Sequence, residues 1–219
     1  MPAGNLTAAI NEGIRMCWDE TIGYTFGGDG NPDSNGYDCS AFVIRCLYRA
    51  GFNVPAHRMG TAYMAPYLVT AGFTELSYSS GMQLQSGDIF VINDGSYGHT
   101  FFYVENINGY TDSSGRSASI GHLNKCKVEA SSSRTSGYSY ANGDPGTIPG
   151  DVNNPVGFGD YPRNGSGAHW EVWVHAYSSL TNGHPDNTVK VYRWPTPYDP
   201  QFDDKALVLL GSLLLFRRK

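Results

Sequence analysis

Two residues that could act as a nucleophile and its base stand on separate predicted elements of this sequence. Cys39 begins a predicted helix, where unpaired N–H groups and the positive end of the helix dipole stabilise a thiolate. His99 begins a predicted strand, and an imidazole can take a thiol proton and return it to a leaving amine. A polar residue on the next strand would complete the order used in thiol catalysis. The alternative for Cys39 is a small buried residue, the usual place of a free cysteine.

The segment after Cys39 has the apolar spacing of a helix packed on a core. Gly51 stands where a helix C-terminal cap is expected, and Asp38 or Ser40 can cap the N-terminus. The predicted buried face consists of Phe42, Val43, Cys46, Leu47 and Ala50.

The remaining elements indicate a sheet covered by helices. Further helices are predicted over 6–19 and 61–71, the second packing through Tyr63, Met64, Tyr67 and Leu68. An Asp-Gly turn at 93–96 predicts a hairpin. Strands are predicted at 89–92, 99–104, 125–130, 170–177 and 188–194, with a hairpin extension within 106–126 and a long surface loop over 131–167.

Composition limits the classes of protein that this chain can represent. Its 219 residues fit one domain with a sizeable core, and 40% hydrophobic with 16% charged residues is typical of a soluble globular protein. A net charge of -5 argues against a general nucleic-acid binder. The four cysteines show no metal-type spacing, and Cys39 and Cys46 would lie roughly 10 Å apart along one helix, so we expect reduced thiols.

The two ends of the chain suggest how the protein is delivered. The N-terminus lacks the charged and apolar regions of a Sec signal, which suits synthesis in the cytoplasm and release to an outside substrate by another route. Residues 206–216 are apolar and precede three basic residues, in a segment too short for an ordinary membrane span of about 20 residues. A docked terminal helix and a membrane-touching tail both remain open. We therefore divide the chain into a domain over 1–198 and a tail over 199–219.

Five short motifs, in order, resemble the NlpC/P60 family of bacterial and phage cell-wall cysteine peptidases. The resemblance covers about residues 6–194. The motifs are Tyr24-Thr25-Phe26-Gly27-Gly28, Asp38-Cys39-Ser40-Ala41-Phe42-Val43, Ser86-Gly87-Asp88-Ile89-Phe90, Gly98-His99-Thr100 and Val128-Glu129-Ala130-Ser131.

The resemblance implies a role for each matched polar residue. Cys39 corresponds to the nucleophile and His99 to the general base, while Glu129 stands where many members have a histidine. A carboxylate can also orient an imidazole, and His122 is the rival for this third role.

Three further positions are implied to bind substrate. Tyr24 would contact the substrate or the oxyanion, and Asp38 and Ser40 would contact its amine or carboxylate. Helix capping is an equal alternative for Asp38 and Ser40. The backbone N–H of Cys39 is a natural oxyanion donor.

The resemblance implies an α+β, papain-like NlpC/P60 fold with N-terminal helices packed on an antiparallel sheet. It implies a monomeric peptidoglycan hydrolase that cuts stem peptides, of the γ-D-glutamyl endopeptidase type, without metal or cofactor. An N-acetylmuramoyl-L-alanine amidase of phage-lysin type, a thiol protease or deamidase acting on protein, and a wall-binding module that lacks activity remain alternatives.

Overall fold

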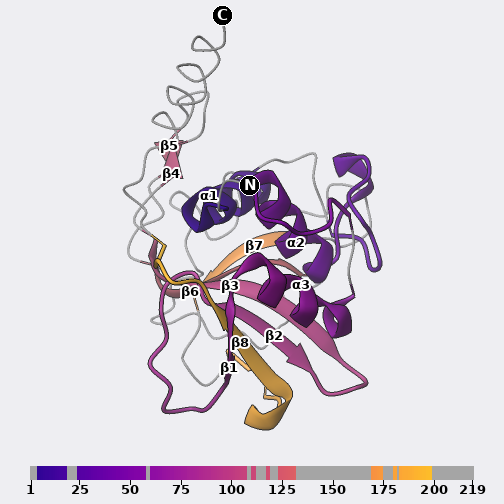
Figure 1. The fold of residues 1–219 in the computed structure, drawn as a ribbon. Helices are drawn as coiled ribbons and strands as arrows, with labels where there is room; N and C mark the ends of the chain where they lie inside the picture. The colour runs from indigo at the N-terminus through magenta and orange to yellow at the C-terminus, as the bar shows by residue number, and fades with distance from the viewer. Residues whose placement is uncertain are drawn as a thin grey trace, which may run out of the picture.

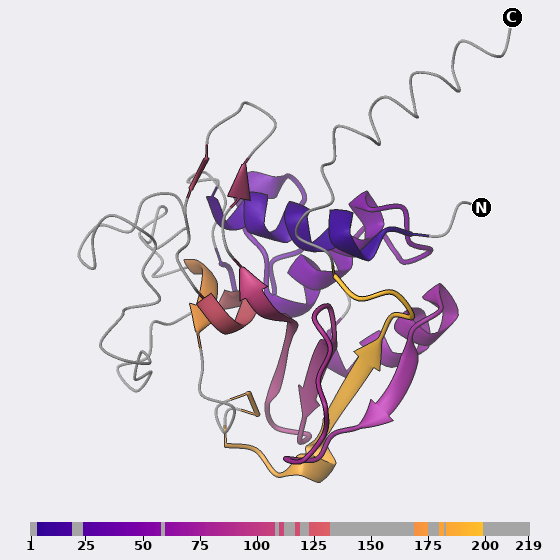
Figure 2. The same ribbon diagram turned by 90° about the vertical axis from the view of Figure 1, so that its left-hand side faces the viewer.

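The computed structural model is an α+β structure in which α-helices cover one face of an antiparallel sheet (Figure 1). Viewed from the side, the helices form one layer above the strands (Figure 2). The α+β class with an antiparallel sheet is thereby confirmed. The described residues are 4–18, 24–57, 60–107, 110–111, 117–118, 123–131, 169–174, 180–181 and 183–198.

The three predicted helices are present among the described residues. They are α1 (Leu6–Trp18), α2 (Cys39–Arg49) and α3 (Met64–Ala71), the last entered through a 3-10 turn at Thr61–Tyr63. Gly72 ends α3 with a φ of 106°, a left-handed conformation that favours glycine. The prediction that Tyr63 packs in the core was wrong, because the 3-10 turn leaves it 67% exposed while Met64 and Leu68 are buried.

One six-stranded sheet carries most of the predicted strands, in the order β1-β8-β2-β3-β6-β7. Neighbouring strands pair antiparallel throughout, and β4 and β5 form the separate hairpin expected within 106–126. The edge strand β1 was not predicted, since its four residues are largely exposed and lack an alternating pattern. The strands are β1 (Thr74–Ser77), β2 (Ile89–Asn93), β3 (Gly98–Ile107), β4 (Tyr110–Thr111), β5 (Ser117–Ala118), β6 (Leu123–Ser131), β7 (His169–Val174) and β8 (Val189–Arg193).

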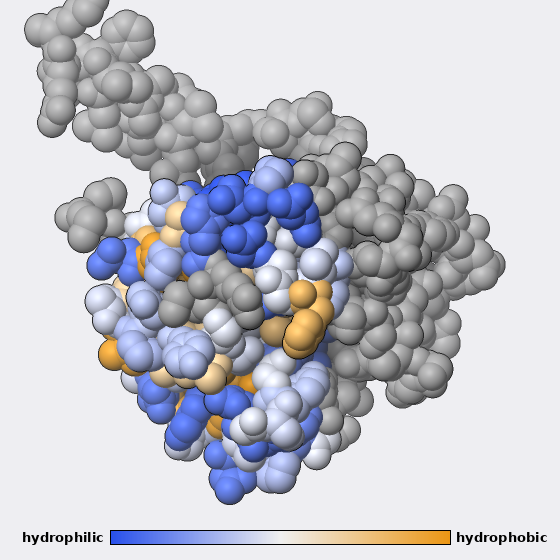
Figure 3. All heavy atoms as spheres, turned by 90° about the vertical axis from the view of Figure 1, so that its right-hand side faces the viewer, coloured by the Kyte–Doolittle hydropathy of each residue, from blue (hydrophilic) through white to orange (hydrophobic). Residues whose placement is uncertain are grey.

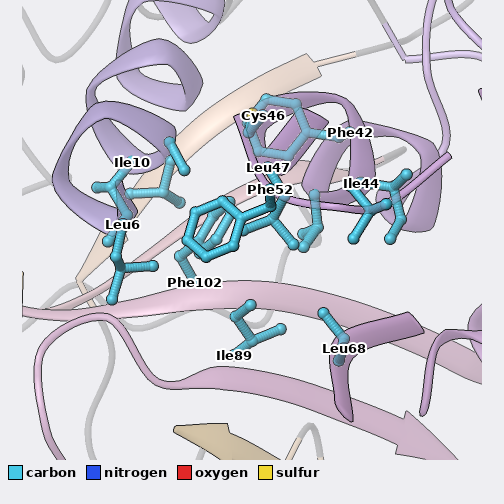
Figure 4. Packing of buried hydrophobic residues seen from close by; sticks show 14 of the residues in the cluster. Leu6, Ile10, Phe42, Ile44, Cys46, Leu47, Phe52, Leu68, Ile89 and Phe102 are labelled. Atoms are coloured by element: carbon cyan, nitrogen blue, oxygen red, sulfur yellow. The ribbon is translucent and has the colours of Figure 1, made fainter. Parts of the chain in front are cut away.

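Hydrophobic clusters lie on both faces of the sheet. On the helix side, one cluster contains Leu6 and Ile10 of α1, Phe42 of α2, and Phe102 and Ile89 of the strands (Figure 4). A second cluster on the other face includes Phe90, Phe101 and Tyr103. Alternation along β3 therefore sends neighbouring residues to opposite faces, both of them buried.

Surface and terminal features complete this description. The face seen in Figure 3 is mainly hydrophilic where it is coloured, with hydrophobic side chains in small separate groups.

Within the described residues no helix is long and apolar enough to cross a membrane. Cys39 and Cys46 are both buried on α2. The predicted tail over 199–219, most of the 131–167 loop, and His122 lie outside the described residues.

Candidate active site

Cys39 is the first residue of α2, and the residue before it caps the helix. Asp38 accepts hydrogen bonds through Oδ1 from the Ala41 N–H at 2.7 Å and the Ser40 hydroxyl at 2.8 Å. Both polar residues are buried, and the apolar face of α2 packs on the sheet. Of the two cap candidates, Asp38 is therefore the N-cap, and it holds the thiol where helix N–H groups stay unpaired within the helix.

The glycine-rich segment before α2 is folded tightly against the cap. The Thr25 N–H donates to the Tyr37 carbonyl, and the Asp38 N–H donates to the Gly28 carbonyl. A Cβ on Gly28 would lie 2.6 Å from the Gly36 carbonyl oxygen, so a larger residue does not fit. The backbone approaches closely at Gly28, and this packing places Tyr24 beside the start of α2.

His99 contacts both of the residues with which sequence analysis grouped it. Its Nε2 lies 2.6 Å from Glu129 Oε2, and Cys39 is close enough to the ring to raise the pKa of His99. Cys39 Sγ is also 4.0 Å from the Gly98 carbonyl oxygen, so the start of α2 meets the start of β3. Since Nε2 faces Glu129, Nδ1 is the nitrogen left for the thiol. All three side chains are buried.

Burial and neighbouring groups act in opposite directions on the imidazole. Burial alone lowers the pKa of His99, but the charge and hydrogen bond of Glu129 and the neighbouring Cys39 outweigh it, raising the pKa to about 9. The imidazolium form is therefore favoured at neutral pH, which is the form that stabilises a thiolate and protonates a leaving amine.

Tyr24 lies close to the same thiol. Burial, followed by the nearby Cys39, Asp38 and Tyr97, raises the pKa of the Tyr24 phenol. Its hydroxyl therefore keeps its proton across the physiological range, so it can donate a hydrogen bond to a carbonyl or oxyanion.

Glu129 occupies the third position, while its rival His122 is not among the described residues. Lys127, which the sequence did not single out, is fully buried on the same strand. The His184 ring stacks on Tyr97 with centroids 4.4 Å apart and pairs with Asp94. The sequence Lys127-Val128-Glu129 could have indicated that the lysine lies near Glu129. Side chains alternate along a strand, so these two charged residues share one face.

The assembled groups have the geometry for nucleophilic thiol chemistry: a thiol, an imidazole and a carboxylate in a chain of contacts. In the described part of the molecule, no group of three or more His, Cys, Asp or Glu residues could hold a metal ion.

Comparison with known proteins gives this geometry a context. A family model described as bacteriophage peptidoglycan hydrolase (Amidase_5) matches residues 21–147, more than half of the chain. The chain is also 28% identical over 92 residues to a protein named Lysin from Pneumococcus phage Dp-1; the match covers 40% of this chain and 30% of the lysin. The family match includes Cys39, His99 and Glu129. The chain therefore belongs to the Amidase_5 family of bacteriophage peptidoglycan hydrolases.

Proposed function

We propose that this chain hydrolyses an amide bond in peptidoglycan through a thiol mechanism. The observation that carries the proposal is the contact of the His99 imidazole with both the Cys39 thiol and the Glu129 carboxylate. The family match to phage peptidoglycan hydrolases supports the substrate class. A helix-borne thiol beside a strand-borne histidine, with helices on an antiparallel sheet, supports a papain-like domain of the NlpC/P60 type over residues 1–198.

In the first half of the proposed reaction, the Cys39 thiolate attacks the amide carbonyl while the imidazolium of His99 holds the thiol proton. The helix N–H groups and the Tyr24 hydroxyl stabilise the oxyanion. His99 then protonates the leaving amine, the C–N bond breaks, and a thioester remains. In the second half, His99 takes a proton from water, the hydroxide attacks the thioester, and the thiol is regenerated. Glu129 keeps the imidazole oriented throughout.

The first candidate bond lies within the stem peptide, at a γ-D-glutamyl linkage. Asp38 and Ser40 border the nucleophile and would face the substrate's amine or carboxylate in that reaction. Their mutual hydrogen bond and the Asp38 bond to Ala41 support the capping role at least as directly.

The second candidate bond is the N-acetylmuramoyl-L-alanine amide, and exposed aromatic residues near the thiol favour it. Phe26 is 91% exposed in the turn after Tyr24, and Tyr97 is 39% exposed beside Gly98. Tyr63 is 67% exposed in the 3-10 turn whose Thr61 packs on Gly98. Exposed aromatic faces of this kind can stack on sugar rings, and only the amidase bond adjoins a sugar.

Digestion of purified sacculi tests the proposal and separates the two bonds. Wild type and Cys39→Ala are incubated with walls of several chemotypes, and the products are identified by mass spectrometry. An amidase releases stem peptides that begin with L-alanine and leaves bare glycan, whereas a γ-D-glutamyl endopeptidase leaves a dipeptide on the sugar. Both activities should vanish in Cys39→Ala and persist in EDTA. Loss of activity in EDTA with recovery in zinc would overturn the thiol mechanism.

A further inference from the structure

The middle of β6 carries a lysine that is entirely enclosed. Lys127 has 0% relative exposure, although lysine is almost never fully buried without compensating partners. Its strand lies between β3 and β7 in the sheet, and Lys127 pairs in register with Tyr103 and Trp173. A buried ammonium is costly, so its retention in a core strand calls for an account beyond packing.

The surroundings of Lys127 lead directly to the candidate active site. Its ammonium lies 4.5 Å from the centroid of the Phe101 ring, within cation–π range. The Phe101 ring is in turn 5.9 Å from the His99 ring. Glu129 is two residues along β6 from Lys127, so both charged side chains leave the same face of the strand.

We propose that Lys127 is a positioning residue that acts on His99 through Glu129. Its positive charge keeps the buried carboxylate ionised and limits how tightly the Glu129–His99 pair holds its proton. The proposal rests on the proposed function, and it assigns the lysine no contact with the substrate.

The charge balance of the buried site explains why a cation is needed there. A thiolate at Cys39 and the buried carboxylates of Glu129 and Asp38 face one imidazolium at His99, so negative charge is in excess. A cation on the same strand as Glu129 reduces this excess away from water, where an uncompensated charge is expensive. Without that cation, the pair would bind its proton more tightly and release it at higher pH.

Other titratable residues lie on the elements around this group. Tyr103 on β3 pairs in register with Lys127, and Glu171 on β7 pairs in register with Glu129. Cys39 approaches His99 from the start of α2, next to the buried Asp38, and the Tyr97 ring lies 6.3 Å from the His99 ring. Burial lowers the pKa of Lys127 to about 8 against the opposing effect of Glu129, so the lysine is still charged at neutral pH.

The test is an NMR titration of the His99 ring in the full chain, with the signal assigned through His99→Gln. In Lys127→Met, which keeps the length of the side chain and removes its charge, the titration midpoint should rise by about 1 pH unit. Lys127→Arg should restore the wild-type midpoint. The basic limb of wall hydrolysis should shift in the same direction as the NMR midpoint.

Lys190→Met is the matched control, because Lys190 lies on the same sheet and its Nζ is 3.7 Å from the exposed Glu75. It should leave the His99 midpoint unchanged. An unshifted midpoint in a folded Lys127→Met overturns the proposal, and so does a Lys127→Arg midpoint equal to that of Lys127→Met. Failure of Lys127→Met to fold assigns the lysine to the core and also overturns it. The titration needs no substrate, so its outcome is independent of whether the chain cuts peptidoglycan.

Discussion

Two buried carboxylates in the same sheet illustrate how a partner decides what an acid can do. Asp88, just before β2, and Glu129, on β6, are 0% and 1% exposed. Asp88 accepts hydrogen bonds from Arg193 Nε at 2.8 Å and from Arg193 Nη2 at 2.6 Å. It also accepts a hydrogen bond from the Gln85 N–H. Glu129 instead faces His99 at 2.6 Å.

The difference between the two acids lies in whether the partner can release a proton. Arginine stays charged at every physiological pH, so the Asp88–Arg193 ion pair is permanent. It links the end of β8 to the residue before β2. Histidine gains and loses its proton near neutrality, so the Glu129 contact can change its charge during a reaction. We therefore expect Asp88 to matter for stability and Glu129 for chemistry.

Glu129→Gln should give the largest effect in this comparison. Loss of the oriented, charged imidazole should lower kcat by about 10²–10⁴-fold while the fold is retained. Because burial would then act on His99 without the opposing carboxylate, the pKa of His99 should fall and the basic limb of the pH–rate profile should move to lower pH. A turbidity assay of wall lysis across pH measures both changes. An unchanged basic limb would remove Glu129 from the mechanism.

Asp88→Asn should destabilise the fold by about 2–4 kcal/mol, because it leaves a guanidinium partly buried without its counter-charge. The activity of the molecules that remain folded should keep the wild-type pH profile. Urea unfolding, with activity measured well below the transition, checks both statements. Lys190→Ala, which breaks the exposed pair with Glu75, is the control and should cost less than about 1 kcal/mol. A shifted pH profile in Asp88→Asn would contradict the division of roles.

The two contacts should also differ in how stability depends on pH. His99 has a folded-state pKa of about 9, above its ordinary value of 6.5, so its contribution is complete below pH 6.5 and is lost as pH rises through 9. The free energy of unfolding should therefore fall by about 1 kcal/mol between pH 6.5 and 7.5. Lys127, with its pKa lowered to about 8, acts in the opposite direction at higher pH, which makes this lower window the informative one.

Urea unfolding at the two pH values measures this slope in wild type and His99→Gln. The slope should disappear in the variant, whereas Asp88→Asn should keep it because that substitution leaves His99 and Glu129 in place. An equal slope in His99→Gln would show that another group is responsible.

The same two carboxylates show how much of the fold and of the candidate site could be predicted from the sequence. Glu129 was predicted because Val128-Glu129-Ala130-Ser131 resembles the strand motif that carries the third residue in the NlpC/P60 family, and local patterns gave α2 and the hairpin before β3. Asp88 was recognised only as part of a strand-entry motif, since its partner Arg193 is 105 residues away. Lys127 was missed for a related reason: a lysine in a strand is usually solvated, and only tertiary packing buries this one. Local sequence patterns therefore did not predict burial and ion pairs that depend on residues far apart in the chain.

Asp38 adds a third buried carboxylate to the comparison, and it accepts hydrogen bonds from two uncharged donors, the Ser40 hydroxyl and the Ala41 N–H. Ser40→Ala should cost about 1 kcal/mol of stability, because Asp38 loses the hydrogen bond from the Ser40 hydroxyl but keeps that from the Ala41 N–H. Since Ser40 is 1% exposed and points its hydroxyl at Asp38, KM for a soluble stem-peptide or muropeptide substrate should stay unchanged. Ser40→Thr, which keeps the hydroxyl, is the matched variant for the hydrogen bond. A several-fold rise in KM for Ser40→Ala that Ser40→Thr reverses would instead assign the hydroxyl to substrate binding.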